Sequence, residues 1–340
     1  MAILPEYPFE RIDYGATLEV APGIHWVRMQ LPFALNHVNL WLLEDDGGWA
    51  IVDTGYNDEP TRERWTAALA RIAGDRPVTQ LIVTHFHPDH CGLAGWFAEQ
   101  RGAALSMTAA EWLQAHLNRH AGATADLEQR LAFFAANGLP DDALAGYRRE
   151  RPDFARILRP LPGVYGRLMD GETIAIGGRR WRVITGGGHS PDHAALWCAE
   201  ANVLISGDQV LPRISTNVSV PSYEPGGDPL RLFLQSFDKF RPLPSDALVL
   251  PSHDRPFYGL HDRLAALDAH HADRLERTWN ACAEPRTAAE MIPTIFDRTL
   301  DAHQLGFAIG EALSHANYLV TDGRLARIRD ADGLFRYRRT

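Results

Sequence analysis

The sequence contains few cysteines and almost no lysine. Its three cysteines, Cys91, Cys198 and Cys282, are too few and too widely spaced for a disulfide framework, which favours a reducing, cytoplasmic location. Lys239 is the single lysine among 34 basic residues, and the net charge is −9. This charge disfavours indiscriminate binding to nucleic acid, although the arginines leave room for a local basic groove.

Long apolar runs are also missing. No run approaches the roughly 18 residues that a membrane-spanning helix needs. The opening segment, MAILPEYPFERIDYG, lacks the basic region and apolar core of a secretion signal. With 340 residues, 45% hydrophobic and 23% charged, the composition is that of a globular chain with a main domain and a small one. We therefore expect no membrane partner.

The order of strand and helix patterns predicts two sheets packed face to face. Residues 23–55 alternate as strands between Gly/Asp turns, 59–74 have helical periodicity, and 78–85 form a short buried strand. Residues 108–160 are helical in character, and strand signals return over 172–253. Strands with a helix, a helical insertion, and then strands again indicate an α/β sandwich with helices outside.

The last part of the chain has a different pattern. Three helical patterns are followed by two strands around an Asp-Gly turn, and these segments cover 266–283, 287–296, 302–320 and 323–339. This is the outline of a winged helix. Residues 265–340 contain 10 Arg, no Lys and 11 Asp plus Glu, so the basic surface of a DNA-binding module is absent. We expect a homodimer contact or a wall of the active-site cleft instead.

One short segment concentrates metal-binding side chains. THFHPDH, residues 84–90, follows the buried strand and supplies His85, His87, Asp89 and His90. Imidazole and carboxylate groups bind zinc and similar metals, and alternate positions on a turn let side chains face two adjacent centres. Three more candidates each follow an apolar strand: His189, Asp208 and His253. Since such strands end at one edge of a sandwich, all seven side chains are expected to converge.

These segments, with one other, occur in the same order as in the metallo-β-lactamase superfamily, which the chain resembles. They are VDTG (52–55), THFHPDH (84–90), GGHSPDH (187–193), SGD (206–208) and PSH (251–253). The resemblance implies an αββα metallo-β-lactamase sandwich over 1–264, with a helical insertion at about 108–160. A winged-helix-like C-terminal domain is expected over 265–340.

The resemblance also implies a dinuclear site. The residues implied for the first metal are His85, His87 and His189, those for the second are Asp89, His90 and His253, and the bridging residue is Asp208. Asp53 of VDTG is expected to orient a ligand histidine by a hydrogen bond. The flavodiiron branch has Glu in place of His87, so two Zn²⁺ are favoured, although the ligands also suit iron or manganese.

Such a pair of zinc ions lowers the pKa of a bridging water and supplies hydroxide at neutral pH. Asp89 is then expected to be both a ligand and a catalytic base. His193, four residues after His189, either donates a proton to the leaving group or supports a ligand. We therefore expect a metal-dependent hydrolase of a small ester, thioester or lactone.

The alternative function is a metal-dependent single-strand endoribonuclease. GGHSPDHAALW, the later SGD and the tail resemble the subgroup containing beta-lactamase-like protein 2, some of whose members cut single-stranded RNA. The single lysine weighs against this activity, because nucleases guide the phosphate backbone with Lys and Arg. A DNA-binding regulator on an inactive scaffold is hard to reconcile with seven intact ligand positions.

Several residues are expected around the metals. Aromatic side chains of the insertion fall where a lid would lie, although their helical spacing is more typical of a core. They are Phe133, Phe134, Tyr147, Phe154 and Tyr165. Phe33 and His37 are expected to border the site. Acyl-homoserine lactonases carry a Tyr three residues after the bridging aspartate, where this chain has Leu211, and Tyr223 is the expected substitute.

Overall fold

The computed structural model of the chain describes residues 5–120, 124–150, 153–296 and 300–340. Each of its two compact units combines several segments of the sequence. Unit 1 contains Met1–His120, Asp153–Thr216 and Lys239–Leu264, and unit 2 contains Ala121–Pro152, Asn217–Asp238 and Ala265–Thr340. Unit 2 therefore groups the expected C-terminal domain with part of the expected helical insertion.

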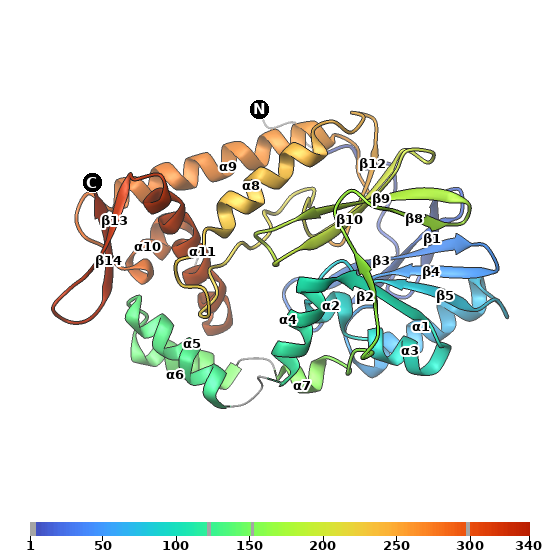
Figure 1. Cartoon of the computed structure of the whole chain (residues 1–340), viewed down its shortest axis with the longest axis horizontal. Helices are drawn as coiled ribbons and strands as arrows, with labels where there is room; N and C mark the ends of the chain where they lie inside the picture. The colour runs from blue at the N-terminus through green and yellow to red at the C-terminus, as the bar shows by residue number, and fades with distance from the viewer. Residues whose placement is uncertain (1–4, 121–123, 151–152, 297–299) are drawn as a thin grey trace. The chain divides into compact units, whose positions relative to one another are not determined.

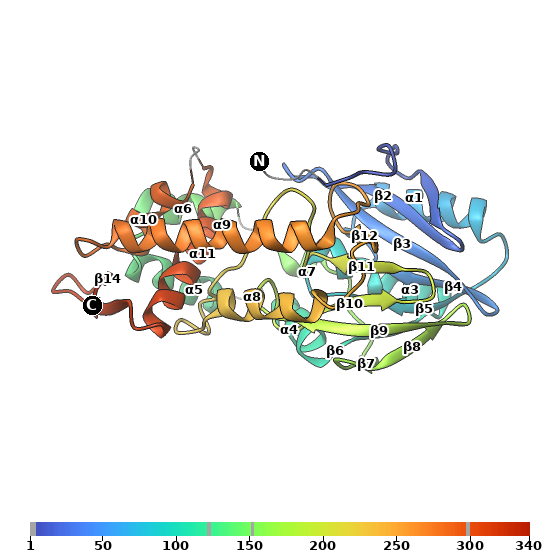
Figure 2. The ribbon, with the colours of Figure 1, turned by 90° about the horizontal axis from the view of Figure 1, so that it is seen from above.

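Two β-sheets form unit 1 (Figure 1). The strands of the first sheet, in order across it, are β1 (Thr17–Ala21), β2 (Ile24–Gln30), β3 (His37–Asp45), β4 (Gly48–Val52), β5 (Val78–Ile82), β6 (Ala104–Thr108) and β7 (Gly166–Leu168). The strands of the second are, in order, β12 (Leu248–Pro251), β11 (Val203–Gly207), β10 (His193–Cys198), β9 (Arg179–Gly186) and β8 (Thr173–Ile176). The predicted sandwich is confirmed: Figure 1 shows the two sheets as an upper and a lower layer, and in Figure 2 the second sheet lies in front of the first.

Strand β3 shows why the first sheet is buried on both faces. Its alternate residues belong to different clusters, because successive side chains of a strand point to opposite faces. Leu40 and Leu42 join a cluster with the helices outside the sheet. Trp41 and Leu43 join a second cluster with residues of β9 to β12, between the two sheets. The core of unit 1 is thus continuous through this sheet.

The outer face of the first sheet is covered by α1 (Glu59–Ile72) and α3 (Ala94–Arg101), whose Trp65 and Phe97 belong to the first cluster. Helix α1 begins where the sequence predicts. The Asp58 carboxylate accepts a hydrogen bond from the Thr61 amide at 2.8 Å, which satisfies one of the free N–H groups of the first turn.

The described residues of the segment 108–160 are mostly helical, as expected. Its helices are α4 (Ala109–His120), α5 (Thr124–Ala136), α6 (Asp141–Glu150) and α7 (Phe154–Ile157). Helices α4 and α7 belong to unit 1, whereas α5 and α6 belong to unit 2.

Unit 2 packs α5 and α6 with elements from the end of the chain. These are α10 (Ala288–Ile295), α11 (Ala302–Thr321) and the hairpin of β13 (Leu325–Arg329) and β14 (Phe335–Arg339). The division between the units falls within α8 (Pro229–Phe240) and α9 (Leu260–Ala281). The expected helices and hairpin are therefore present, while the winged-helix assignment stays a prediction.

Close backbone contacts join the segments of unit 2. Tyr147 of α6 lies against Gly306, where a Cβ atom would be 2.5 Å from its ring. Gly138, at φ of 92°, likewise leaves room for the Thr287 side chain. The Val220 amide donates to the Gly310 carbonyl at 3.1 Å. Three segments distant in sequence thus form one packed unit.

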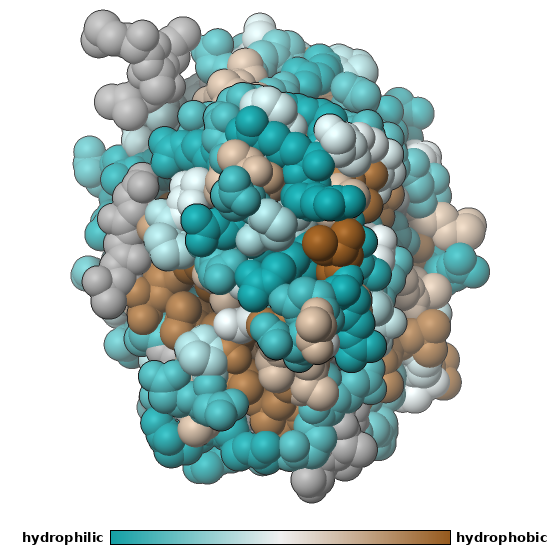
Figure 3. Space-filling view, turned by 90° about the vertical axis from the view of Figure 1, so that its left-hand side faces the viewer, coloured by the Kyte–Doolittle hydropathy of each residue, from teal (hydrophilic) through white to brown (hydrophobic). Residues whose placement is uncertain are grey.

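The face of unit 2 around α10 and the hairpin is mostly hydrophilic, with hydrophobic residues in separate patches (Figure 3). The homodimer expected from the tail stays a prediction. Among the described helices, none has the length and apolarity needed to cross a membrane. The cytoplasmic location also stays a prediction.

Replacing Trp65 with Phe should destabilise unit 1 by about 1–3 kcal/mol. Trp65 is fully buried, and its indole N–H donates to the Thr54 carbonyl at 2.8 Å, so the change removes both ring volume and a buried hydrogen bond. Urea unfolding measures the loss. Trp96→Phe is the control, because Trp96 is only partly buried. Equal effects of both substitutions would contradict this account of the core.

Candidate metal centre

The seven predicted ligands lie together at one edge of the sandwich, beyond the carboxyl ends of β5, β9, β11 and β12. His85 follows β5, and Asp89 and His90 lie on the short helix α2 (Pro88–Cys91). His189 follows β9, Asp208 follows β11 and His253 follows β12. Strands β4 and β5 run parallel, as do β11 and β12, so these strand ends meet at the same edge. Convergence follows from the topology.

One group of ligand atoms consists of three imidazoles and a carboxylate. The members of this first group are His85, His87, His189 and Asp208. His85 Nε2 lies 2.9 Å from His87 Nδ1 and 3.2 Å from His189 Nε2. His189 Nε2 lies 3.3 Å from Asp208 Oδ2. All these atoms are within 4.8 Å of one another.

A second group contains Asp89, His90 and His253. Asp89 Oδ2 lies 3.5 Å from His90 Nε2 and 3.6 Å from His253 Nε2. Asp208 reaches this group too, with Oδ2 at 3.7 Å from His90 Nε2 and Oδ1 at 3.4 Å from His253 Nε2. Asp208 therefore lies between the two groups, where a bridging ligand is expected.

The donor atoms fit metal ions in spacing and in chemistry. Ligands about 2.0–2.1 Å from a tetrahedral zinc ion lie about 3.3 Å apart, close to the separations within each group. His90 Nε2 and Asp208 Oδ1 are buried and have no hydrogen-bond partner among the described residues. Buried polar atoms without partners are costly, so their common orientation toward the other ligands supports binding of a cation.

Hydrogen bonds fix which nitrogen of each histidine is available. His90 Nδ1 lies 2.8 Å from the Asp53 carboxylate, which only accepts, so Nδ1 carries the proton and Nε2 faces the site. Thr84 Oγ1 donates to Asp53 at 2.8 Å and hence accepts from His85 Nδ1 at 2.9 Å. The hydrogen bond expected from Asp53 to a ligand histidine is confirmed.

Residues of strand β3 orient His253 by hydrogen bonds. Its Nδ1 donates to the His37 carbonyl at 2.8 Å, which leaves Nε2 toward the second group. The fully buried Asn39 donates to the carbonyls of Pro251 and Asp254, at 2.8 and 3.0 Å. Asp254 has a φ of 70°, so Asn39 stabilises a strained turn beside a ligand.

Burial and charge act in opposite directions on the pKa values of these groups. Burial disfavours the charged form of His90, but the carboxylates of Asp89 and Asp208 outweigh it and raise the His90 pKa well above its usual value. Burial lowers the pKa of His87 to about 3. Burial alone would raise the Asp208 pKa, but facing His253 and His90 hold it well below the usual range. The carboxylates of Asp89 and Asp208 therefore favour a positive charge between them.

Glu111 of α4 is a further supporting residue that the sequence analysis did not identify. Its Oε1 accepts from the Ser190 hydroxyl at 2.6 Å and the Asp192 amide at 2.7 Å, and its Oε2 accepts from the Phe86 amide at 2.9 Å. These partners flank His87 and His189, so one buried carboxylate joins two ligand loops. A Glu in the first turn of a helix is common, and the sequence carries no signal that this one is buried.

His193 is fully buried behind Asp208. Its Nε2 accepts a hydrogen bond from the Asp208 amide at 3.0 Å, and burial lowers its pKa to about 3. Gly207 makes this contact possible, because it adopts a φ of 54° and a Cβ there would be 2.3 Å from His193 Nε2. Of the two roles expected for His193, this geometry favours support of a ligand.

A cavity of about 200 Å³ lies beside His253, and His37 lines it as expected. Of the predicted lid aromatics, Phe134 and Tyr147 pack within unit 2, and Tyr165 stacks on Trp112 at 4.7 Å. Phe134, Tyr147 and Tyr165 therefore pack against neighbouring side chains, as residues of a core do, which is the alternative to a lid that their spacing favours. Tyr223 is half exposed in unit 2, and its role as a proton donor stays a prediction.

Comparison with known proteins places the chain in a family. The profile of the metallo-beta-lactamase superfamily matches residues 34–253, and that of the metallo-beta-lactamase-like C-terminal domain matches 275–340. A beta-lactamase domain protein from Burkholderia ambifaria is 44% identical, with 99% of this chain and 98% of that chain covered and a TM-score of 0.92. A metallo-beta-lactamase family protein from Thermus thermophilus is 30% identical, with coverage of 95% and 100% and a TM-score of 0.80.

Two curated relatives have more specific descriptions. A probable metallo-hydrolase of Bacillus subtilis is 21% identical over 308 residues, which are 86% of this chain and 91% of the relative. An acyl-coenzyme A thioesterase of Bos taurus is 24% identical over 209 residues, which are 58% and 67% of the two chains. The chain belongs to the metallo-beta-lactamase superfamily and is a metal-dependent hydrolase.

Proposed function

We propose that the chain is a dinuclear zinc hydrolase of small esters, thioesters or lactones. The observation that carries this proposal is the position of Asp208 between two groups of histidine and carboxylate ligands. Two zinc ions held there would lower the pKa of a water and polarise the carbonyl oxygen of a substrate. The similarity to an acyl-coenzyme A thioesterase supports an acyl substrate.

Asp89 is the proposed proton acceptor for the attacking water. Burial raises its pKa, but the imidazoles of His90 and His253 lower it to about 2, so Asp89 is ionised at neutral pH. Its carboxylate is partly exposed, whereas Asp208 and the ligand histidines around it are more deeply buried. A carboxylate that both faces the ligands and reaches solvent can accept a proton and release it.

The other residues act by positioning the ligands. Asp53 and Thr84 orient His90 and His85, and Glu111 joins the loops of His87 and His189. We assign His193 a positioning role, since its Nε2 is engaged by the backbone of Asp208. Fixed ligand orientation strengthens metal binding, and loss of such support typically costs 10–100-fold in affinity or activity.

Protein purified without chelator should contain about two metal equivalents per chain, as measured by elemental analysis. Asp208→Asn should lower both metal content and activity, because an amide cannot replace a bridging carboxylate. Metal should also be lost as the pH falls below about 6, since histidines bind metal only when deprotonated. Exposed Asp75→Asn serves as the control. Full metal content in Asp208→Asn would refute the bridging role.

Glu111→Gln should weaken metal binding by roughly 10–100-fold. The amide nitrogen of Gln would face backbone or hydroxyl donors, which leaves a buried donor without an acceptor. Competition with a chelator measures metal affinity, and thermal unfolding measures stability. Glu99→Gln is the control, because Glu99 is exposed and its ion pair with Arg159 lies at the surface. Unchanged chelator competition in Glu111→Gln would show that Glu111 does not position the loops.

Aryl esters, thioesters or lactones should be hydrolysed with little dependence on salt between about 50 and 300 mM, and Asp89→Asn should remove most of this activity. An RNA substrate would behave differently, because each neutralised phosphate contributes a slope of about −0.7 to the log–log salt dependence. Salt-sensitive cleavage of single-stranded RNA without any acyl hydrolysis would favour the alternative of an endoribonuclease.

A further inference from the structure

The cavity beside His253 has two cationic side chains at its edge. It is lined by Arg11, Leu35, His37, Pro212, Arg213, Ile214, His253 and Asp254. We infer that this cavity binds an anionic group of the substrate, such as a carboxylate or phosphate, and so selects acyl compounds that carry a negative charge. The identity of the ligand as an acyl compound rests on the proposed function. Anion binding by the cavity is tested separately, in an experiment that does not depend on catalysis.

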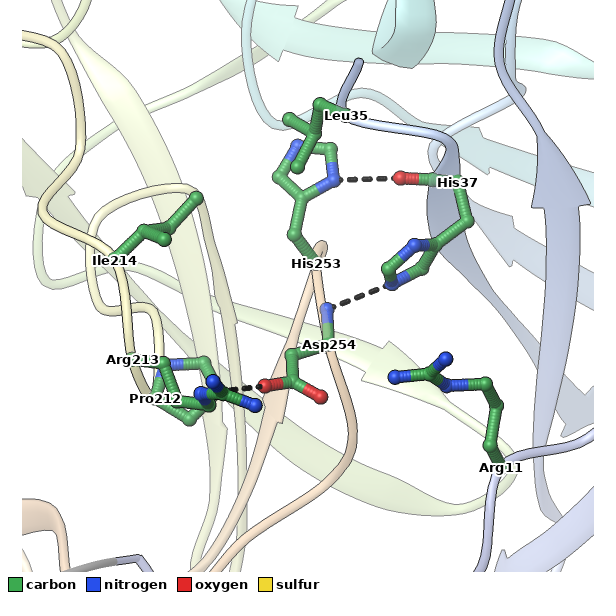
Figure 4. A pocket seen from close by; sticks show the side chains of 8 residues that line it. All are labelled: Arg11, Leu35, His37, Pro212, Arg213, Ile214, His253 and Asp254. Atoms are coloured by element: carbon green, nitrogen blue, oxygen red, sulfur yellow. Dashed lines mark hydrogen bonds and ion pairs between the residues drawn. The ribbon is translucent and has the colours of Figure 1, made fainter. Parts of the chain in front are cut away.

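Neither Arg11 nor Arg213 forms a close ion pair among the described residues. Figure 4 shows the Arg11 guanidinium pointing into the cavity, opposite Arg213. Within the part of the chain that the structure describes, Arg11 forms no ion pair. Arg213 Nε lies 3.9 Å from Asp254 Oδ2, and its side chain is 67% exposed. Such a long, exposed contact contributes little energy, so Arg213 is available to a ligand.

Asp254 is the one carboxylate that lines the cavity, and other groups already engage it. The Tyr7 hydroxyl donates to its Oδ2 at 3.1 Å, and Arg255 Nε lies 3.9 Å from its Oδ1. Its amide donates to His37 Nε2 at 2.8 Å. With two arginines and one carboxylate, the lining has a net positive charge. Arg255, near Asp254, is balanced by an ion pair with Glu10 at 3.7 Å.

The wall that carries Arg213 is fixed. Arg263 donates to the Ile214 carbonyl at 2.7 Å, and Thr216 Oγ1 donates to the Asp208 carbonyl. The loop from Asp208 to Thr216, which carries Arg213, is therefore held by hydrogen bonds near both ends. Binding an anion there requires little reordering of the backbone, which favours affinity.

Size and polarity indicate what kind of group fits. A volume of about 200 Å³ is below the range of roughly 300–1,000 Å³ typical of sites for drug-sized ligands, so only part of a substrate is accommodated. Leu35 and Ile214 add an apolar border and are 38% and 49% exposed. The cavity therefore suits a short apolar chain that ends in a charged group, with the reacting carbonyl toward the metal ligands.

Paired substrates test the selectivity. For the metal-loaded enzyme, kcat/KM should be higher for 4-nitrophenyl hydrogen adipate than for 4-nitrophenyl methyl adipate, which differs in having no charge. Arg11→Ala and Arg213→Ala should each reduce this ratio by about fivefold to tenfold, and the double variant should reduce it further. Arg213→Lys should retain part of the ratio, because the charge remains. The control, Arg180→Ala, alters an arginine that is 82% exposed and should leave the ratio unchanged.

A binding experiment separates the cavity from catalysis. Calorimetry on the metal-loaded protein should show tighter binding of hexanoate than of hexanamide, and the Arg11→Ala/Arg213→Ala double variant should lose this preference. A preference that survives in the double variant would overturn the inference, because another group would then bind the carboxylate. Absence of any preference in the unmodified protein would overturn it too.

The two experiments together distinguish the two proposals. If no ester is hydrolysed but the hexanoate preference is present and depends on the arginines, the anion site stands and the acyl hydrolase proposal fails. If both adipate esters are hydrolysed at a ratio that the arginine substitutions do not change, the hydrolase proposal stands and the anion site fails. Metal content and circular dichroism of each variant exclude a general loss of structure.

Discussion

The buried carboxylate of Asp53 is the interaction on which the metal centre depends. It accepts hydrogen bonds from the Thr84 amide, the Thr84 hydroxyl and the His90 ring, all at 2.8 Å. Asp53 has a φ of 60°, a conformation that costs on the order of 1 kcal/mol in a residue with a side chain. The strained backbone turns the end of β4 toward the next strand, so the sheet and the ligand loop are joined by one side chain.

The elements and the ligands could be predicted from the sequence because their signals are local. Alternating apolar residues in β3, the Asp58 cap of α1 and the compact motif at 84–90 are all visible within short windows. The placement of His189, Asp208 and His253 directly after apolar strands is equally local. The common edge then follows from strand direction, which is why the likeness to the superfamily and the ligand set agree with the geometry.

The supporting residues and the cavity could not be predicted in the same way. Glu111 and Asn39 act on groups 25 to 81 and 212 to 215 positions away in the chain, and nothing near either residue indicates that it is buried. Arg11 and Arg213 come from loops about 200 residues apart and are ordinary surface arginines by composition. Their roles depend on tertiary packing, which no local pattern encodes.

The interleaved segments of unit 2 constrain the order in which the chain can fold during synthesis. Tyr147 packs against Gly306, and the Val220 amide donates to the Gly310 carbonyl, so both residues find their partners only after α11 has been synthesised. Helix α6 and the segment from residue 217 therefore emerge from the ribosome well before their partners, with apolar surface uncovered in the interval. Removal of the tail from residue 265 would leave the same surface uncovered permanently, so the C-terminal region cannot be treated as a module that is cut away without consequence for the rest of the chain.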